Sequence, residues 1–309
     1  MNLILVPQYP AKLRYQEWWY TEFQTHLRKY FDDILVLGQK SFRTDMIRQA
    51  VGSEFSPIDT AIEFELAQIR EYLELDLWDE DVLLLNDLSF PGIFANVLYH
   101  RKPRRCYAIC HATSKNRHDY FQYVRHSKYP NEVAISQLFD LVFVASRYHA
   151  RKLGWKNLEV VGLPLPPFLS ARGVDVRERK LVSVSRPGRQ KSNAQIERQL
   201  ARDGFQIERP EEVATWTDYY DFLRESEKLL STAKEETFGY QIVDAILNGC
   251  VPIAPNTCSY PELLPRGYLY DNYEELVMLL RLDRPCPELL NYDLCVNFYD
   301  TIGKLMTVR

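Results

Sequence analysis

The chain lacks any hydrophobic run long enough to cross a membrane, and it lacks an excess of charge of one sign. Of its 309 residues, 46% are hydrophobic and 26% are charged, and no apolar run approaches the roughly 20 residues that a bilayer requires. The opening residues, MNLILVPQYP, carry no basic segment, so they predict a first β-strand rather than a signal peptide. A net charge of -4 excludes a globally basic nucleic-acid binder.

Cysteine spacing also excludes some classes of protein. The six cysteines include no two Cys or Cys/His pairs at zinc spacing, and Cys106 and Cys110 flank an expected strand. This use of cysteine favours a reduced, cytoplasmic protein. Internal repeats and low-complexity segments are absent as well.

In the first half, short apolar runs alternate with amphipathic stretches, a pattern typical of parallel sheets covered by helices. Ser146 is expected to cap the helix that follows it. The expected strands are 3–6, 34–37, 82–85, 106–110, 141–145 and 158–161. The expected helices are 15–30, 61–75, 93–99, 132–139 and 147–153.

Residues 162–173 contain three prolines and two glycines, which interrupt both strand and helix. The alternation then resumes, with strands expected at 180–185, 205–208, 229–233, 251–254 and 268–270. Helical segments are expected at 193–203, 218–225, 240–248, 261–264 and 274–280, and in the amphipathic tail 289–306.

The alternation predicts two doubly wound α/β domains of unequal size. We expect an N-terminal acceptor-side domain at 1–165, a smaller nucleotide-binding domain at 166–288, and a C-terminal helix at 289–309 that packs back on the first domain. Ligands of such sheets bind at the carboxyl ends of the strands, so the predicted site lies in a cleft between the domains.

The most informative stretch runs from Ser231 to Ala254. A buried strand is followed by a polar loop with Glu236, and a helix opens near Gly239, where its free N–H groups and partial positive charge suit a diphosphate. Gly239 allows a ligand to approach the backbone closely, and Asp244 can reach toward the same ligand. Gly249 is expected just after the end of the helix.

This stretch resembles the motif of the retaining GT-B glycosyltransferases, in which a Glu, seven residues and a second acid follow a strand. The resemblance implies that Glu236 lies beside the donor sugar and that Phe238 and Gly239 match the internal Phe-Gly. It places Asp244, where Glu is usual, on the nucleotide ribose. Glu262 looks like the family's later acid.

A second match follows the first strand of the second domain. Related enzymes place an Arg there and a Lys five residues later on the donor diphosphate, and Arg186 and Lys191 fill these positions. Arg189 is a third candidate. Arg offers a fork of donors and Lys a compact charge, which suits a leaving diphosphate. Each of these motifs, taken alone, is commonly explained by surface charge or by packing. Their order along the chain and their α/β context together favour a glycosyltransferase.

The first domain resembles the family in architecture only. His111 follows a strand, where members often bring a His toward the donor sugar; a structural histidine is the equal alternative. Asp87 ends another strand and either orients an acceptor hydroxyl or caps a turn. The glycine-rich first loop of many relatives is replaced by residues 7–14, which predicts a different acceptor pocket.

Residues 100–128 hold eight Lys or Arg and one acid, a net charge of +7, together with four of the six histidines. Cations among aromatic residues suit a polyanion with an exposed base, although a solvated basic loop is the alternative. The candidate acceptor-binding residues are Asp87, Lys115, Arg117, Tyr120 and Arg125.

The sequence therefore predicts a nucleotide-sugar-dependent hexosyl- or pentosyltransferase that uses a UDP- or GDP-sugar, retains configuration, and needs neither cofactor nor metal. The predicted acceptor is a hydroxymethylated or otherwise modified nucleic-acid base, in DNA before tRNA, as for enzymes that glycosylate bacteriophage DNA in the host cytoplasm. A polysaccharide or lipid-linked acceptor is the alternative. A catalytically weak nucleotide- or nucleic-acid-binding module is the alternative of another class.

Overall fold

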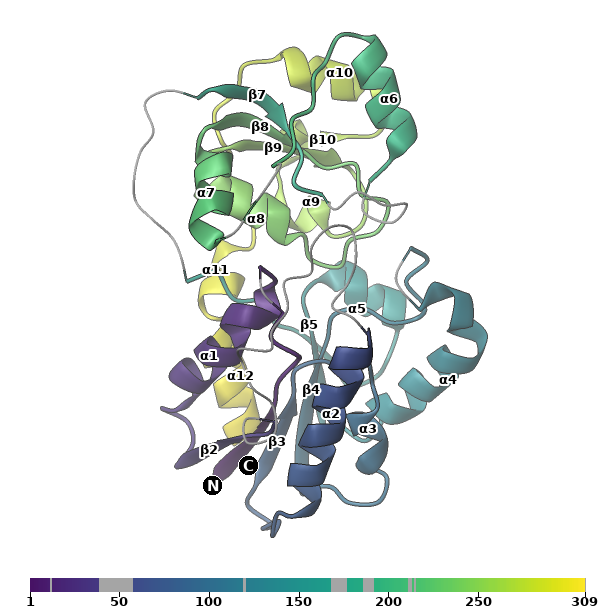
Figure 1. Cartoon of the computed structure of the whole chain (residues 1–309), viewed down its shortest axis with the longest axis vertical. Helices are drawn as coiled ribbons and strands as arrows, with labels where there is room; N and C mark the ends of the chain where they lie inside the picture. The colour runs from purple at the N-terminus through teal and green to yellow at the C-terminus, as the bar shows by residue number, and fades with distance from the viewer. Residues whose placement is uncertain are drawn as a thin grey trace. The chain divides into compact units, whose positions relative to one another are not determined.

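The computed structural model describes residues 1–11, 13–38, 58–118, 121–167, 177–185, 192–210, 213 and 215–308. The chain divides into two compact units (Figure 1). Unit 1 comprises Met1–Pro164 and Leu294–Arg309, and unit 2 comprises Leu165–Asp293. None of the described helices is long and apolar enough to cross a membrane.

Unit 1 is built on a six-stranded sheet in the order β2-β1-β3-β4-β5-β6, with every neighbouring pair parallel. Its strands are β1 (Asn2–Val6), β2 (Asp33–Val36), β3 (Val82–Leu85), β4 (Arg105–Cys110), β5 (Leu141–Val144) and β6 (Leu158–Val160). The central strands read as almost continuous apolar runs because helices bury both of their faces.

Helices cover both faces of this sheet (Figure 1). Tyr72, Phe94, Ile135 and Leu153 bring four helices into one apolar core with the strands. These helices are α2 (Ile58–Leu73), α3 (Phe94–Val97), α4 (Arg125–Ser136) and α5 (Arg147–Leu153).

A second layer of unit 1 pairs α1 (Tyr15–Leu27) with α12 (Phe298–Thr307), two helices from opposite ends of the chain. Phe298 is fully buried, with its ring 5.8 Å from that of Phe23 and 6.2 Å from that of Trp19. The C-terminal helix thus packs on the first helix within the same unit.

Unit 2 contains a four-stranded parallel sheet in the order β10-β9-β8-β7. Its strands are β7 (Arg179–Val182), β8 (Ser226–Leu230), β9 (Val251–Pro255) and β10 (Leu269–Tyr270). Its helices are α6 (Ala194–Arg202), α7 (Trp216–Arg224), α8 (Tyr240–Leu247), α9 (Tyr260–Leu263) and α10 (Tyr273–Arg281). Helix α11 (Tyr292–Val296) contains the point at which the chain passes from unit 2 to unit 1.

The structure corrects three predicted elements. Residues 205–208 form no strand and contribute only an isolated bridge between Glu208 and Val182. Helix α4 begins at Arg125 and contains Pro130, because buried contacts of its inner face outweigh the usual effect of an internal proline. The expected tail helix is two helices, α11 and α12.

The predicted N-cap at Ser146 and the predicted helix end at Gly249 are both confirmed. The Ser146 side chain accepts the N–H of His149 at the start of α5. Gly249 follows the end of α8 with a φ of 70°, a left-handed conformation that glycine adopts readily.

Candidate active site

The loop from Ser231 to Gly239 connects the carboxyl end of β8 to α8. Gly239 precedes the helix with a φ of 104°. A Cβ at Gly239 would lie 3.2 Å from Leu263, 3.3 Å from Tyr260 and 3.5 Å from Cγ of Glu236. The Glu236 side chain therefore lies beside the first turn of α8, where the helix leaves its N–H groups without helical partners.

Ser259 holds this loop in place. Its hydroxyl donates to the carbonyl of Phe238 at 2.7 Å and lies 3.2 Å from that of Glu236. The Phe238 side chain is buried and packs edge-on against Tyr240. Phe238 thus anchors the loop through its buried ring and its carbonyl.

A polar network missed by the sequence analysis joins the ends of β7 and β8 to α8 and α9. Ser185 donates to Oε1 of Gln241 at 2.9 Å, and Nε2 of Gln241 donates to Ser231 at 2.8 Å. The hydroxyls of Ser231 and Tyr260 are 2.7 Å apart. No sequence motif predicts that these residues interact, because only the fold brings them together.

Asp244 lies one and a half turns into α8 and is only 5% exposed. Its carboxylate accepts hydrogen bonds from the hydroxyls of Tyr219 at 3.0 Å and Tyr220 at 3.4 Å, both on α7. Burial raises the pKa of Asp244 to about 7. Neither tyrosine was among the predicted site residues, since adjacent tyrosines in a helix usually indicate packing.

For the other predicted donor-site residues, the structure gives less information about their surroundings. Glu262 lies in the first turn of α9, partly exposed, and its N–H donates to the carbonyl of Ser259. Arg186, Arg189 and Lys191 lie outside the described residues. Their role on a diphosphate stays a prediction.

Replacing Gly239 by alanine is expected to lower the free energy of unfolding of unit 2 by about 2–4 kcal/mol, because backbone strain adds to overpacking. The matched control is Gly204→Ala, since Gly204 also has positive φ, 86°, but no atom within 4 Å of the added Cβ. We expect the control to lose only the backbone part, about 1 kcal/mol. Urea denaturation measures both losses, and equal values would contradict the close packing around Gly239.

In unit 1, His111 follows the carboxyl end of β4. Its Nε2 lies 3.0 Å from the carbonyl oxygen of Asn86, and its ring packs on Tyr15 and Trp19 with centroids 5.2 and 4.9 Å away. Burial lowers the pKa of His111 to about 4, so the ring is neutral at pH 7. A carbonyl can only accept, so Nε2 carries the proton and Nδ1 is left as an acceptor.

His149, on α5, is a neighbour of His111 that the sequence analysis missed. It is fully buried, and within the described part of the chain neither ring nitrogen has a hydrogen-bond partner. Burial lowers the pKa of His149 to about 3, with a smaller contribution from the positive charge that His111 carries when it is protonated at low pH. The Oδ1 atom of buried Asn86 likewise finds no partner among the described residues. Unsatisfied polar atoms therefore gather near His111.

Asp87 follows the carboxyl end of β3 and is 6% exposed. It accepts hydrogen bonds from Nε2 of Gln8 at 2.5 Å and from the N–H of Ser89 at 3.0 Å. Burial, with a smaller contribution from the nearby charge of Glu65, raises the pKa of Asp87 to about 8. Asp87 thus combines turn capping with a position at the carboxyl edge of the sheet.

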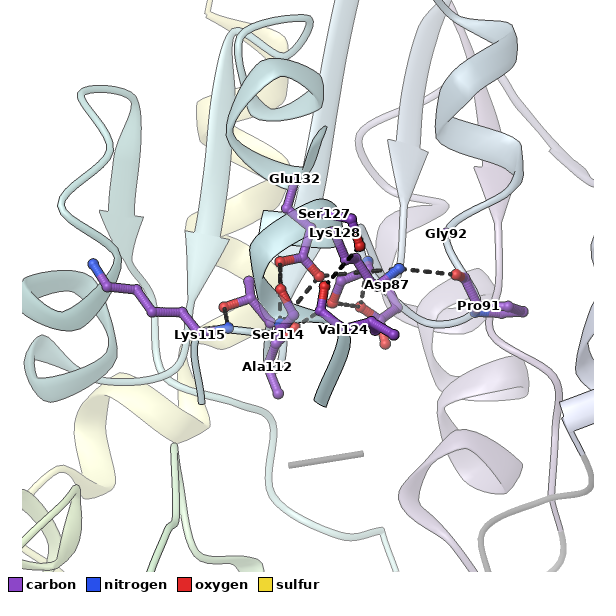
Figure 2. A network of polar contacts seen from close by, with 12 residues as sticks. Asp87, Pro91, Gly92, Ala112, Ser114, Lys115, Val124, Ser127, Lys128 and Glu132 are labelled. Carbon is purple, nitrogen blue, oxygen red and sulfur yellow. Dashed lines mark hydrogen bonds and ion pairs between the residues drawn. The ribbon is translucent and has the colours of Figure 1, made fainter. Parts of the chain in front are cut away.

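A polar network fixes the loops after β3 and β4 relative to α4 (Figure 2). Buried Glu132 accepts the N–H and the hydroxyl of Ser114, the latter at 2.8 Å. Lys128 lies 4.0 Å from Glu132 and donates to the carbonyl of Pro91 at 3.3 Å. Lys115 points away from this network in Figure 2, with its ammonium 5.1 Å from the ring centre of Tyr129.

The basic stretch 100–128 is not one patch, because β4 divides it. Arg101 and Lys102 lie before the strand, where they donate to carbonyls of Leu73 and Leu138. The six residues of β4 span about 20 Å. Only the part after β4 is near His111: there Lys115 is partly exposed and Arg117 and Arg125 are exposed, whereas Tyr120 lies outside the described residues.

The one Asp-x-Asp triplet of the chain, Asp79–Asp81, lies at the other edge of the sheet, before β3. Asp81 accepts the N–H of Trp78 and the side-chain amide of Asn2. Its carboxylate therefore has a structural role. Metal independence stays a prediction.

Comparison with solved structures shows the fold. HepE from Anabaena, solved with UDP and glucose, matches with a TM-score of 0.59 and 14% identity, covering 99% of this chain and 95% of HepE. The sucrose-phosphate synthase of Thermosynechococcus elongatus gives 0.59 and 12% over 99% and 94%. The lipopolysaccharide galactosyltransferase WaaB gives 0.58 and 14% over 98% and 97%. The chain also matches TarM with a TM-score of 0.51, but covers 54% of it.

HepE, the sucrose-phosphate synthase and WaaB are GT-B glycosyltransferases. The chain therefore has the GT-B fold, with two Rossmann-like parallel-sheet units, and the predicted fold class is confirmed.

Sequence comparison adds a shorter likeness. A segment of 63 residues is 38% identical to the tRNA-queuosine alpha-mannosyltransferase of Drosophila melanogaster, covering 20% of this chain and 17% of that enzyme. No protein-family model matches the chain.

Proposed function

We propose that the protein is a glycosyltransferase that moves a sugar from a nucleotide-sugar donor to a hydroxyl group of a modified tRNA base. The observation that carries the donor half is the position of Glu236 beside Gly239 and the N-terminus of α8 in a GT-B fold. The segment shared with the tRNA-queuosine mannosyltransferase supports a tRNA base ahead of a DNA base.

In this proposal the donor binds to unit 2. The first turn of α8 receives the diphosphate through its N–H groups and its partial positive charge, with Arg186, Arg189 and Lys191 as further cations. Glu236 holds the sugar, and Asp244 accepts hydrogen bonds from the ribose. The sugar C1–O bond to the diphosphate breaks, C1 bonds to the acceptor oxygen on the same face, and the hydroxyl proton passes to the leaving diphosphate.

The acceptor binds to unit 1. Neutral His111 offers an acceptor nitrogen at the edge of the sheet. Arg117 and Arg125 are exposed and suit phosphates, while Tyr123, 72% exposed, offers a ring on which a base can stack. Asp87 and Lys115 complete the acceptor side.

The decisive experiment supplies UDP-, GDP- and ADP-sugars with three acceptors: total tRNA, hydroxymethylated DNA and plain DNA. Mass spectrometry of the digested nucleosides then identifies any glycosylated base. We expect a sugar on a tRNA nucleoside. Transfer to hydroxymethylated DNA alone would replace the acceptor, and donor hydrolysis without any base product would favour a polysaccharide or lipid-linked acceptor.

Removing the two exposed arginines after β4 is expected to weaken tRNA binding. The double variant Arg117→Gln/Arg125→Gln should bind about tenfold more weakly, and the slope of log K against log salt should fall by about 2, one unit per lost phosphate contact.

The matched control is Arg104→Gln, because Arg104 is exposed but lies before β4. We expect its salt titration to follow that of the wild type. Equal losses in control and double variant would show that the whole of 100–128 contacts the nucleic acid.

A further inference from the structure

Asp244 is a buried acid whose charge is not balanced by a cation. Among the described residues, no Lys or Arg contributes to its pKa. Two neutral donors take the place of a cation: the hydroxyls of Tyr219 and Tyr220 donate to Oδ2 at 3.0 Å and to Oδ1 at 3.4 Å. A buried carboxylate without a counter-charge is costly, so the stability of the fold alone does not account for an acid at this position.

Aromatic packing within α7 fixes where these two hydroxyls lie. The rings of Tyr219 and Tyr220 are 5.2 Å apart, and the ring of Trp216 is 6.0 Å from each of them. Thr215 and Asp218 form a capping box that fixes the first turn of the same helix. The Tyr219 hydroxyl is thus held in place before a ligand arrives, and its shorter contact makes it the stronger of the two donors.

Neutral donors leave the Asp244 carboxylate able to accept further hydrogen bonds. An ionised carboxylate offers about four lone-pair sites, and the two tyrosines each occupy one of them. An arginine in their place would bind both oxygens in a bidentate contact and balance the charge. The acceptor sites that remain suffice for the two adjacent hydroxyls of a ribose.

This acceptor capacity belongs to the ionised form, because a protonated carboxyl uses one oxygen as a donor. Burial raises the pKa of Asp244 to about 7, whereas the hydrogen bonds from Tyr219 and Tyr220 lower it. A further titratable neighbour, Cys250 just before β9, acts on Tyr219 and is a neutral thiol at pH 7, since burial raises its pKa to about 12. The two tyrosines are therefore the described side chains that favour an ionised Asp244.

We propose that Tyr219 is a positioning residue for the nucleotide of the donor, because its hydroxyl holds Asp244 as an ionised acceptor for the ribose hydroxyls. Tyr220 is a weaker second donor to the same carboxylate. The position of Asp244 on the ribose rests on the proposed function, and the role of Tyr219 goes beyond it. The site therefore selects a ribonucleotide over its 2′-deoxy form, and this selection weakens when the carboxylate is protonated.

The test compares UDP, GDP and ADP with their 2′-deoxy forms by calorimetry on the full-length protein at pH 8. For the nucleotide that binds most tightly, we expect the wild type to prefer the ribose form about tenfold or more, as for a hydrogen bond to a charged group. Tyr219→Phe should lower this preference about threefold or more, because the carboxylate loses one hydrogen bond. The matched control is Tyr273→Phe, which also removes a tyrosine hydrogen bond to an acid of unit 2, Asp203, and should leave the preference unchanged.

Two further measurements distinguish positioning of Asp244 from a merely structural role of Tyr219. In the wild type, the preference for ribose should fall as the pH drops through the pKa of Asp244, about 7. In Tyr219→Phe, the midpoint of this fall should move up by about one pH unit, because the ionised form has lost a donor. In an Asp244→Asn background, Tyr219→Phe should have no further effect on the preference, since the hydroxyl acts through the carboxylate.

Tyr220→Phe is the second variant, which keeps the test decisive if Tyr219→Phe does not fold. It should lower the preference for ribose in the same direction by a smaller factor. Nucleotide binding with the preference and its pH midpoint unchanged in the tyrosine variants would overturn the proposal alone, as would an equal loss from Tyr219→Phe with and without Asp244. If none of the three nucleotides binds, the donor half of the proposed function fails and the proposal fails with it.

Discussion

Replacing Glu236 by glutamine is expected to lower sugar transfer by about a hundred- to a thousandfold, with the fold intact. The amide has the same size as the carboxylate but no charge. Glu236 lies beside the first turn of α8, where a donor sugar joined to a diphosphate would lie. Loss of one preorganised electrostatic contact to a developing charge has this magnitude in other enzymes.

The effect should appear in the rate rather than in donor affinity, if the contact strengthens in the transition state. Single-turnover transfer measures the rate, calorimetry measures the donor Kd, and a melting curve checks the fold. Glu274→Gln makes the same chemical change on an exposed acid of unit 2 and should leave all three values unchanged. Wild-type turnover in Glu236→Gln would rule out the assigned role.

The strands of both sheets could be predicted because their apolar runs are short, buried and separated by glycine or proline. The short stretch 205–208 resembles a strand in composition, but pairing with β7 extends only to the bridge at Glu208. Helix α4 was misplaced because Pro130 locally opposes a helix, while burial of Glu132 and Ile135 favours it. Tertiary contacts decide such cases.

In the candidate site, too, local sequence patterns could be predicted and contacts between distant segments could not. Glu236, Gly239 and Asp244 lie close together in sequence and have a recognisable spacing. Tyr219 and Tyr220, by contrast, meet Asp244 from another helix, and His149 approaches His111 from α5. Such pairings depend on packing between elements, which local sequence does not encode. The basic stretch 100–128 was wrongly predicted to form one patch for a related reason. Strand β4 lies inside it, so the basic residues before and after the strand are at opposite ends of β4.

Asp244→Asn is expected to stabilise unit 2 at high pH and to weaken donor binding. The pKa of Asp244 is raised in the folded state, from 3.8 to about 7. The folded state therefore holds the proton more tightly than the unfolded state, so the stability contributed by protonated Asp244 is full below pH 4 and is lost as pH rises to about 7. Asparagine removes this dependence and can still accept a hydrogen bond from Tyr219.

The stability difference between variant and wild type should therefore grow by about 3 kcal/mol between pH 5 and pH 8, at about 1.4 kcal/mol per pKa unit. Hydrogen exchange of the α8 amides measures this difference in stability. The contributions of the other titrating groups, including Asp87, are the same in variant and wild type and therefore cancel.

Donor affinity should meanwhile fall about 10- to 100-fold, the usual loss for a hydrogen bond to a charged group. Asp283→Asn, on an exposed acid of unit 2, should change neither stability nor affinity. A pH-independent difference would mean that the two tyrosine hydroxyls offset the burial of the carboxylate. Unchanged donor affinity would instead remove Asp244 from the ribose. Gain of stability with loss of binding is the expected signature of a carboxylate kept buried for a ligand rather than for the fold.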